Sequence, residues 1–354
     1  MTSDKVARLV DAARSAPSAD NSQPWRFVAT ADEFGCHYCR RSAVDPFGAS
    51  GHATLLSAGA VHENLARMVA APAGDGVVNR RLDSDSWSIA LPLAQFQPAA
   101  VPREVEAGIS GRHTNRRPFR KDRISGLASL LPAAGDSLRV VAAHEAILAL
   151  AASLESCSRA RFNDPELHHW LFSSLRWDEA EAASGTGLDM ATLHLPPGGR
   201  LFMRFMAPWE RMRLLNRLGI YRVLAAADTA LFRQAPAVLA LVGGSGPEEV
   251  WETGRIMQRT WIALNQAGVA VHPYYAITDL GNRLAAGRLL PDWTRSVGKA
   301  LDSAAEVLNL APRERIHMLF RIGYPTRSPV RSRRLPAATF LAADRPPSSR
   351  QAVA

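Results

Sequence analysis

A run of twelve residues near the N-terminus, 16–27, constrains the fold of this chain more than any other segment. It reads Ala-Pro-Ser-Ala-Asp-Asn-Ser-Gln-Pro-Trp-Arg-Phe, so two prolines enclose a group of small polar residues. A helix is predicted over residues 4–14, and both prolines disfavour helix in the residue before them. Residues 25–30 then alternate like a strand. The run therefore predicts a helix that stops, a polar turn and a strand that begins at Trp25.

The rest of the chain mixes helices and strands without regular alternation. Helices are predicted over 54–71, 145–156, 248–267 and 296–308, and an amphipathic segment over 124–134. Strands are predicted over 87–93, 138–143, 237–242 and 317–322. No G-x-G-x-x-G follows a strand, and no G-x-x-x-x-G-K-[ST] occurs in the sequence. The pattern therefore does not support a dinucleotide-binding or P-loop fold.

The net charge of +9 does not indicate a nucleic-acid-binding protein, because much of it lies in one segment. From residue 327 onward there are six arginines and a single acid, Asp344, so this tail supplies +5 of the total. Arginine holds phosphate in a fixed fork, so a small phosphorylated ligand is a better interpretation than a polyanion. The last residues, 341–354, are predicted to be a disordered, solvated tail.

The 354 residues are enough for one large domain or two modest ones. The longest apolar stretch, 235–242, is far shorter than the roughly 20 residues of a membrane span. The N-terminus does not resemble a signal peptide, and three cysteines form no disulfide framework. We therefore expect a soluble cytoplasmic protein. The lone pair Cys36 and Cys39 lacks the two further ligands of a zinc site, so no metal is expected.

Residues 160–235 form a long helical stretch that is rich in arginines and large apolar residues. A basic amphipathic helix can lie on a membrane surface. More often such a stripe belongs to a helix with one face in the core and a solvated back, and this is the prediction for residues 200–224.

A second short motif, Arg112-His113-Thr114-Asn115-Arg116-Arg117-Pro118-Phe119, suits the binding of a phosphate. In an extended chain, alternate side chains share a face, so Arg112, Thr114 and Arg116 can converge on one phosphate group. The alternative is an ordinary basic loop, which is common for runs this short.

The two motifs together resemble the FMN-dependent nitroreductase superfamily. Residues 17–27 match its P-S-x-x-N-x-Q-P-W-x-F segment, and residues 112–119 look like its R-x-[ST]-x-R-x-F phosphate-binding motif. Gly323-Tyr324-Pro325 followed by Arg333 and Arg334 is similar to its closing strand and a further phosphate contact. Residues 254–272 look like its central helix and glycine turn. The resemblance implies an α+β fold and a non-covalently bound FMN.

The order of the motifs is the reverse of that in an ordinary nitroreductase. The resemblance implies a homodimer in which one subunit supplies the arginines and its partner supplies the P-S-x-x-N segment. Here the first half, 1–105, has only the P-S-x-x-N segment, and the second half, 106–340, with a helical insertion at 160–235, has only the arginine motif. This arrangement resembles the Acg-like branch, whose two nitroreductase-like halves are fused as an internal pseudo-dimer. It implies one FMN per chain and allows a monomer.

The resemblance also implies roles for individual residues and a reaction class. The FMN phosphate would contact Arg112, Thr114, Arg116 and Arg334 or Arg333, and the ring would contact Pro17, Ser18, Asn21 and Gln23. His272 or Tyr274 could contact a substrate, although a packed aromatic turn is an equal alternative. No catalytic acid or base is named, because the flavin performs the redox step in this family.

Three functions remain open from the sequence. The first is an FMN oxidoreductase for a small flat substrate, either nitroaromatic, quinone-like or biosynthetic, with NAD(P)H or oxygen as co-substrate. The second is an FMN-binding protein whose flavin lies beneath a lid and turns over little. The third, a flavin-free remnant, is disfavoured because all elements of one site are retained. Residues 160–235 decide between the first two, depending on whether they cover the ring or stand beside it.

Overall fold

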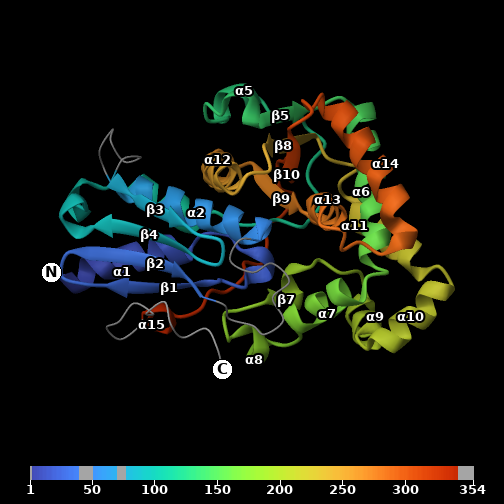
Figure 1. The fold of residues 1–354 in the computed structure, drawn as a ribbon, viewed down its shortest axis with the longest axis horizontal. Coiled ribbons are helices and arrows are strands. Elements are labelled where there is room, and N and C mark those ends of the chain that lie inside the picture. Colours follow the sequence, from blue (N-terminus) through green and yellow to red (C-terminus); the bar gives the residue numbers. More distant parts are fainter. Residues whose placement is uncertain (1, 40–50, 70–76, 342–354) are drawn as a thin grey trace.

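The computed structural model describes residues 2–39, 51–69 and 77–341, and it contains two four-stranded antiparallel sheets (Figure 1). The first sheet has the strand order β1 (Trp25–Ala29), β2 (Glu33–Tyr38), β4 (Trp87–Pro92) and β3 (Asn79–Leu82). The second has the order β5 (Leu138–Val141), β8 (Ala237–Gly243), β10 (Arg315–Gly323) and β9 (Ala270–Tyr274). The mixed α+β class predicted from the sequence is confirmed.

The two sheets share one topology. In each, the strands lie in the spatial order first, second, fourth and third, and a long helix follows the second strand. These helices are α2 (His52–Met68) and α12 (Pro247–Gln266), and they pack against each other more extensively than any other pair of helices (Figure 1). Both are largely buried, because each is covered by a sheet and by the other helix. The shared core thus joins an N-terminal and a C-terminal layer with the same connectivity.

The N-terminal sheet is covered by helices from both ends of the chain. Helix α1 (Thr2–Arg14) buries Leu9, Val10 and Ala13 in the core. The C-terminal arm returns to this sheet, since α15 (Ala337–Phe340) lies beside β1 and residue Leu341 forms a parallel bridge with Phe27. Phe340 packs against Phe27 with ring centroids 5.1 Å apart. The C-terminal arm therefore ties the end of the chain to its beginning.

The second sheet is covered on its other face by three helices. They are α6 (His144–Arg161), α13 (Ala276–Ala285) and α14 (Pro291–Leu308), which share a separate hydrophobic core with β8 and β10. Because both faces are covered, β8 is almost wholly buried. This agrees with the continuous apolar run at 237–242.

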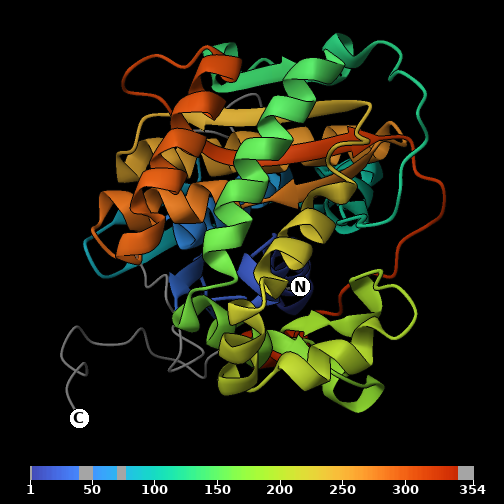
Figure 2. The same cartoon turned by 90° about the vertical axis from the view of Figure 1, so that its right-hand side faces the viewer.

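The insertion between α6 and β8 lies at one corner of the molecule (Figures 1 and 2). Its elements are α7 (Pro165–Ser174), β6 (Leu175–Arg176), α8 (Glu179–Ala182), β7 (Leu188–Asp189), α9 (Gly199–Met206), α10 (Trp209–Arg217) and α11 (Ile220–Ala230). The prediction for residues 200–224 was wrong in two respects. The stretch is broken by Pro208 and by Gly219, whose φ of 86° lies in the left-handed region. Several of its large apolar side chains are also exposed rather than buried.

The remaining helix predictions hold with one exception. The amphipathic segment 124–134 forms only a single short helix, α5 (Leu127–Leu130). Gly126 precedes it with φ 62°, and Leu131 is extended because proline follows it. Helix α4 (Arg103–Gly111) follows a short 3₁₀ turn, Pro98–Ala100.

For membrane-spanning helices and metal sites, the structure can be searched only within the described part of the chain. Within residues 2–39, 51–69 and 77–341, no helix is long and apolar enough to cross a membrane. The same residues contain no cluster of ligands that could hold a metal ion. The tail predicted to be disordered, apart from its first residue, lies outside the described residues.

Candidate functional site

The polar turn between α1 and β1 has an unusual backbone. Asp20, Asn21 and Gln23 have φ values of 43°, 59° and 51°, which place three non-glycine residues in the left-handed region. The Ser18 hydroxyl accepts a hydrogen bond from the Gln23 backbone N–H at 2.9 Å and closes the turn. Such conformations cost of order 1–3 kcal/mol each and are found mainly at functional sites. Pro17 precedes the turn and is half-buried.

The side-chain amides of Asn21 and Gln23 connect the turn to distant segments. Both donate to the carbonyl of Gly185 in the insertion, at 3.2 and 2.9 Å. The Asn21 Oδ1 accepts from the Arg334 guanidinium at 2.6 Å, and the Gln23 Oε1 accepts from the Leu335 N–H at 3.2 Å. The turn, the insertion and the C-terminal arm therefore meet here. The amides that the sequence assigns to the flavin are bonded to the protein itself.

Arg112 lies beside this junction with other arginines and without an acid. It is 8% exposed, and it follows the last residue of α4, where its guanidinium stacks on Trp261 at 4.6 Å. One nitrogen donates to the Ser15 carbonyl at 3.1 Å, whereas the buried Nε has no hydrogen-bond partner among the described residues. Burial lowers the pKa of Arg112 well below its usual value, and the charges of Arg334 and Arg331 lower it further.

Arg334 has the same electrostatic character. Its half-buried side chain has a pKa lowered to about 10, first by burial and then by the nearby charge of Arg14. Within the described part of the chain, neither Arg112 nor Arg334 forms an ion pair with a carboxylate. Because an unneutralised buried charge is costly, this cluster is suited to an anionic ligand.

The second arginine of the motif lies in different surroundings. Arg116 donates to the hydroxyl of Thr192 in the insertion at 3.3 Å. Burial lowers its pKa, while the charges of Asp20 and Tyr274 act in the opposite direction. The structure thus groups Arg112 with Arg331 and Arg334, and Arg116 with the polar turn and β9. The half-buried Thr114 stands between the two arginines in the sequence, and its side chain forms no hydrogen bond with the described residues.

The predicted substrate residues His272 and Tyr274 lie in strand β9 rather than in a turn. Their rings are 4.4 Å apart on the same face of the sheet. Tyr274 is 6% exposed and packs against Phe232, which agrees with the packed aromatic alternative. Burial and the charges of Arg321 and Arg116 lower the pKa of His272 well below its usual value, so its imidazole is neutral at pH 7.

Of the two adjacent C-terminal arginines, only one points to the turn. Arg333 forms an ion pair with Glu179 of α8 and is largely exposed, whereas Arg334 bonds Asn21. The insertion makes a further contact, because the indole N–H of Trp170 donates to the Asp20 carboxylate at 2.8 Å. Together with Gly185 and Thr192, these contacts hold the insertion against the predicted site.

Some residues of this region were not singled out from the sequence. Arg321 lies in β10, is 1% exposed and stacks on Phe119 at 3.9 Å, and burial lowers its pKa to about 10. An arginine within the apolar run 316–323 is a signal that could have revealed it. Trp170 and Gly185 carry no such signal, because their importance depends on the folding of the insertion.

Comparisons with known proteins give remote similarities. No protein-family model matches this chain. The uncharacterized protein MT1398 of Mycobacterium tuberculosis is 26% identical over 294 residues, which cover 77% of this chain and 38% of that protein. The chain thus spans about two fifths of the length of this curated relative.

Several solved structures that are similar to part of this chain are named as nitroreductases or nitroreductase-like proteins. A nitroreductase with bound FMN from Bacteroides fragilis is 11% identical, covers 69% of this chain and all of its own length, and has a TM-score of 0.37. The FMN-dependent nitroreductase NfnB from Mycobacterium smegmatis, in complex with NADPH, is 18% identical, with coverages of 69% and 99% and a TM-score of 0.36. A nitroreductase-like protein from Bacillus cereus has a TM-score of 0.33 at 12% identity, with coverages of 67% and 94%. Similarities this remote do not assign a function to this chain.

Proposed function

We propose that this chain is an FMN-dependent oxidoreductase of the nitroreductase type, acting on a small flat substrate. The observation that carries the proposal is the group formed by Arg112, Arg331 and Arg334, which contains no carboxylate. After burial, the charges of Arg334 and Arg331 lower the pKa of the Arg112 guanidinium, so a dianionic phosphate would stabilise this group. The unpartnered Nε of Arg112 supplies a donor that such a phosphate can satisfy.

The surroundings of this group fit the remainder of an FMN molecule. The hydroxyl of Thr114 is free for a second contact to the phosphate, and the strained turn at 17–23 comes from the other half of the chain. In this proposal Pro17 and Ser18 border the flavin ring. Asn21 and Gln23 either hold the turn through their hydrogen bonds to the protein or replace one of these bonds with a hydrogen bond to the flavin. Arg116 and His272 lie toward the ring, where a cation near the pyrimidine edge favours the reduced, anionic flavin.

The chemistry of the proposal is a two-electron transfer. A bound flavin accepts a hydride from a reductant and passes two electrons to an acceptor, while the protein orients both. The motif resemblance implies NAD(P)H as the reductant, with oxygen as an alternative co-substrate. We assign no residue as a catalytic acid or base. The roles given to this chain are to bind the phosphate, to orient the ring and to exclude water.

The proposal includes a fused pseudo-dimer with one site. The shared strand order of the two sheets supports an origin from two related halves, divided near residues 105 and 106. The C-terminal arm brings Arg334 back to the turn of the first half. A chain that carries both sides of the site would bind one FMN without a partner subunit.

A second function is favoured by the position of the insertion. Gly185, Thr192 and Trp170 bond directly to Gln23, Arg116 and Asp20 respectively. An insertion held this closely could cover the ring, so that the protein stores FMN beneath a lid and turns over little.

Absorbance spectra of the purified chain test the proposal. We expect a yellow protein with about one FMN per chain, and bleaching within milliseconds after NADPH or NADH is added. Bound FMN that neither nucleotide bleaches would favour the storage function instead. Two FMN per chain would contradict the single site, and a chain that cannot be loaded with FMN would overturn both functions.

A further inference from the structure

Large apolar side chains are exposed on the surface formed by α9, α10 and α11. Leu201 is 74% exposed, Phe205 50% and Leu218 82%, and Leu214 and Val223 are also more than half exposed. Elsewhere among the described residues, the exposed large apolar side chains lie scattered along the chain. Single exposed apolar residues need no explanation, whereas a cluster on consecutive helices marks an interaction surface.

Arginines are interspersed with these apolar side chains. Residues 200–223 contain six arginines and one acid, Glu210, which gives a net charge of +5. Glu210 pairs with Arg213 at 2.7 Å, and the other five arginines form no ion pair with the described residues. The five are Arg200, Arg204, Arg211, Arg217 and Arg222. We call residues 200–223 the basic–apolar surface.

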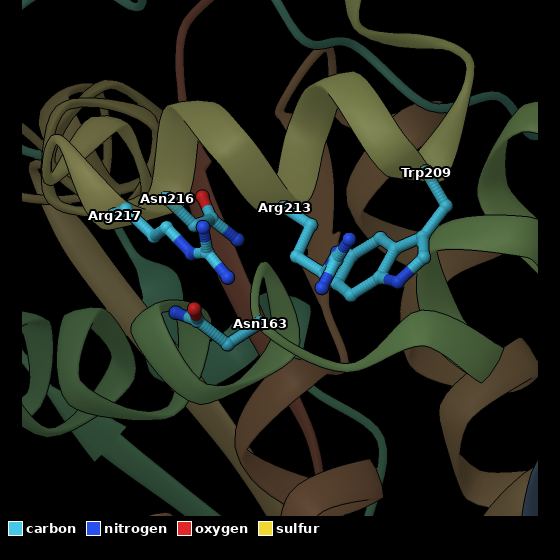
Figure 3. Close-up of a pocket in the computed structure, with 5 residues that line it drawn as sticks. All are labelled: Asn163, Trp209, Arg213, Asn216 and Arg217. Atoms are coloured by element: carbon cyan, nitrogen blue, oxygen red, sulfur yellow. The ribbon is translucent and has the colours of Figure 1, made fainter.

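A cleft beside α10 adds polar groups to this surface. It has a volume of about 250 Å³ and is lined by Asn163, Trp209, Arg213, Asn216 and Arg217 (Figure 3). In the close-up, the side chains of Arg213 and Arg217 extend from the same side of α10, and Asn163 lies opposite them. The amide of Asn216 donates to the Phe162 carbonyl at 2.8 Å, while its buried Oδ1 has no hydrogen-bond partner in the part of the chain that the structure describes. The cleft therefore offers the cation of Arg217, which forms no ion pair with the described residues, beside Arg213, which is paired with Glu210.

We propose that the basic–apolar surface binds to anionic lipid bilayers, with Leu201, Phe205 and Leu218 at the level of the acyl chains and the arginines at the phosphates. Aliphatic and aromatic side chains flanked by arginines are the composition of helices that lie in the plane of a bilayer interface. Phosphodiester headgroups supply the negative charge that this surface lacks, and the cleft beside α10 can take one headgroup.

Charge disfavours a second copy of the chain as the occupant of this surface, and the exposed apolar side chains disfavour a nucleic acid. In a symmetric dimer, this surface would face its own copy, so two patches of net charge +5 would meet. A nucleic acid would neutralise the arginines but would leave the aliphatic side chains of Leu201, Leu214 and Leu218 in water. The inference does not depend on the proposed flavin site, because it uses no residue of the polar turn or of the arginine group.

Sedimentation of the full chain with vesicles tests the inference. We compare vesicles of phosphatidylcholine alone with vesicles in which about a third of the lipid is phosphatidylglycerol. Only the anionic vesicles should bind the chain, and binding should weaken as salt is raised. Leu201→Ser with Phe205→Ser should weaken binding at least tenfold, because less apolar surface enters the interface. Arg200→Gln with Arg217→Gln should weaken it roughly 30-fold, since each basic residue contributes about fivefold.

Matched double variants outside the surface serve as controls. Val140→Ser with Leu148→Ser changes two other exposed apolar residues, and Arg26→Gln with Arg313→Gln changes two other exposed arginines. Both controls should bind vesicles as the wild type does, and all variants should unfold at similar temperatures.

Three outcomes would overturn the inference. One is a chain that sediments with neither kind of vesicle, and another is equal binding to neutral and anionic vesicles. The third is a dimer in the absence of lipid that Leu201→Ser with Phe205→Ser dissociates, since the surface would then join two copies of the chain.

Discussion

Gly59 of α2 and Gly254 of α12 lie against each other where the two helices cross. A Cβ on Gly59 would lie 2.9 Å from the Gly254 Cα, and a Cβ on Gly254 would lie 2.3 Å from the Leu56 carbonyl oxygen. Because α2 begins at residue 52 and α12 at residue 247, each glycine is the eighth residue of its helix. The crossing therefore relates equivalent positions of two equivalent helices, as expected for an internal repeat.

Replacement of Gly254 by alanine should destabilise the protein by about 3 kcal/mol or more. The new methyl group would overlap backbone atoms of α2, and backbone cannot move aside as a flexible side chain does. Gly298→Ala is the matched control, because a Cβ there meets only Leu284 at 3.9 Å in the middle of α14. This control should stabilise the chain by about 0.5–1 kcal/mol. Urea unfolding measures both changes, and equal stabilities for the two variants would contradict the close crossing.

Arg334→Ala should weaken FMN binding and leave riboflavin binding nearly unchanged. A charge-assisted contact to phosphate contributes about 1.5–3 kcal/mol, which corresponds to roughly ten- to over a hundredfold in affinity. Riboflavin has no phosphate, so it reports any general damage to the site. Fluorescence titration with both flavins measures the difference.

Arg333→Ala is the control for that experiment. Its side chain lies one residue away and pairs with Glu179 on the surface, so FMN affinity should change less than threefold. If Arg333→Ala instead causes the larger loss of FMN, the phosphate lies on the other side of the C-terminal arm. If Arg334→Ala weakens both flavins equally, Arg334 acts through its bond to Asn21.

Local patterns in the sequence predict most elements of the fold. The two prolines at 17 and 24 end α1 and begin β1, and the apolar run at 237–242 identifies a strand covered on both faces. These predictions hold because they depend on local backbone restrictions and on periodicity. The failure at 124–134 is also local, since the left-handed Gly126 and the proline after Leu131 limit the helix to one turn.

The candidate site is predicted less completely, because its contacts join distant segments. The motifs identify Asn21, Arg112 and Arg334, which the structure brings to one junction. They do not reveal that Asn21 and Gln23 bond to Gly185, a glycine without sequence signal in the insertion. They also place both motif arginines at one phosphate, whereas the surroundings of Arg112 and Arg116 differ. The phosphate role that the motif predicts for Arg116 therefore stays a prediction, and the position toward the flavin ring is the alternative that we propose.

Trp170→Phe should loosen the insertion from the polar turn. The substitution removes the indole N–H that lies 2.8 Å from the Asp20 carboxylate, a bond to a charged group that contributes about 1.5–3 kcal/mol. Amide hydrogen exchange in residues 165–192 should speed up about tenfold, because the insertion opens more often. FMN should also dissociate faster if the insertion covers it.

Trp177→Phe provides the comparison within the same insertion. Its ring stacks near Phe172 and beneath Arg204, and it makes no bond to Asp20. Exchange in residues 165–192 should stay close to that of the wild type. Faster exchange in both variants would mean that any lost indole loosens the insertion, and the bond to Asp20 would not be its anchor.

The free energy of unfolding should decrease as the pH is lowered below about 6.5, and His52 should contribute to this decrease. Its ring lies at the start of α2, with Nε2 at 2.7 Å from Nδ1 of His317 and Nδ1 at 3.0 Å from the Tyr275 hydroxyl. Burial, and then the adjacent His317, lower the pKa of His52 to about 3. In the unfolded chain this imidazole binds a proton below about pH 6.5, whereas in the folded protein it stays neutral.

Because the unfolded state binds more protons between about pH 6.5 and 3, stability is full above that range and decreases through it. Between pH 8 and pH 5, His52 should lower the free energy of unfolding by at most about 2 kcal/mol. Urea unfolding of the wild type and of His52→Asn between pH 8 and 5 measures this difference. The variant should be less stable at pH 8 but should lose about 2 kcal/mol less on acidification. His144→Asn, at an exposed position, should keep the wild-type pH profile. Parallel profiles for His52→Asn and the wild type would show that His52 is not held neutral in the folded protein.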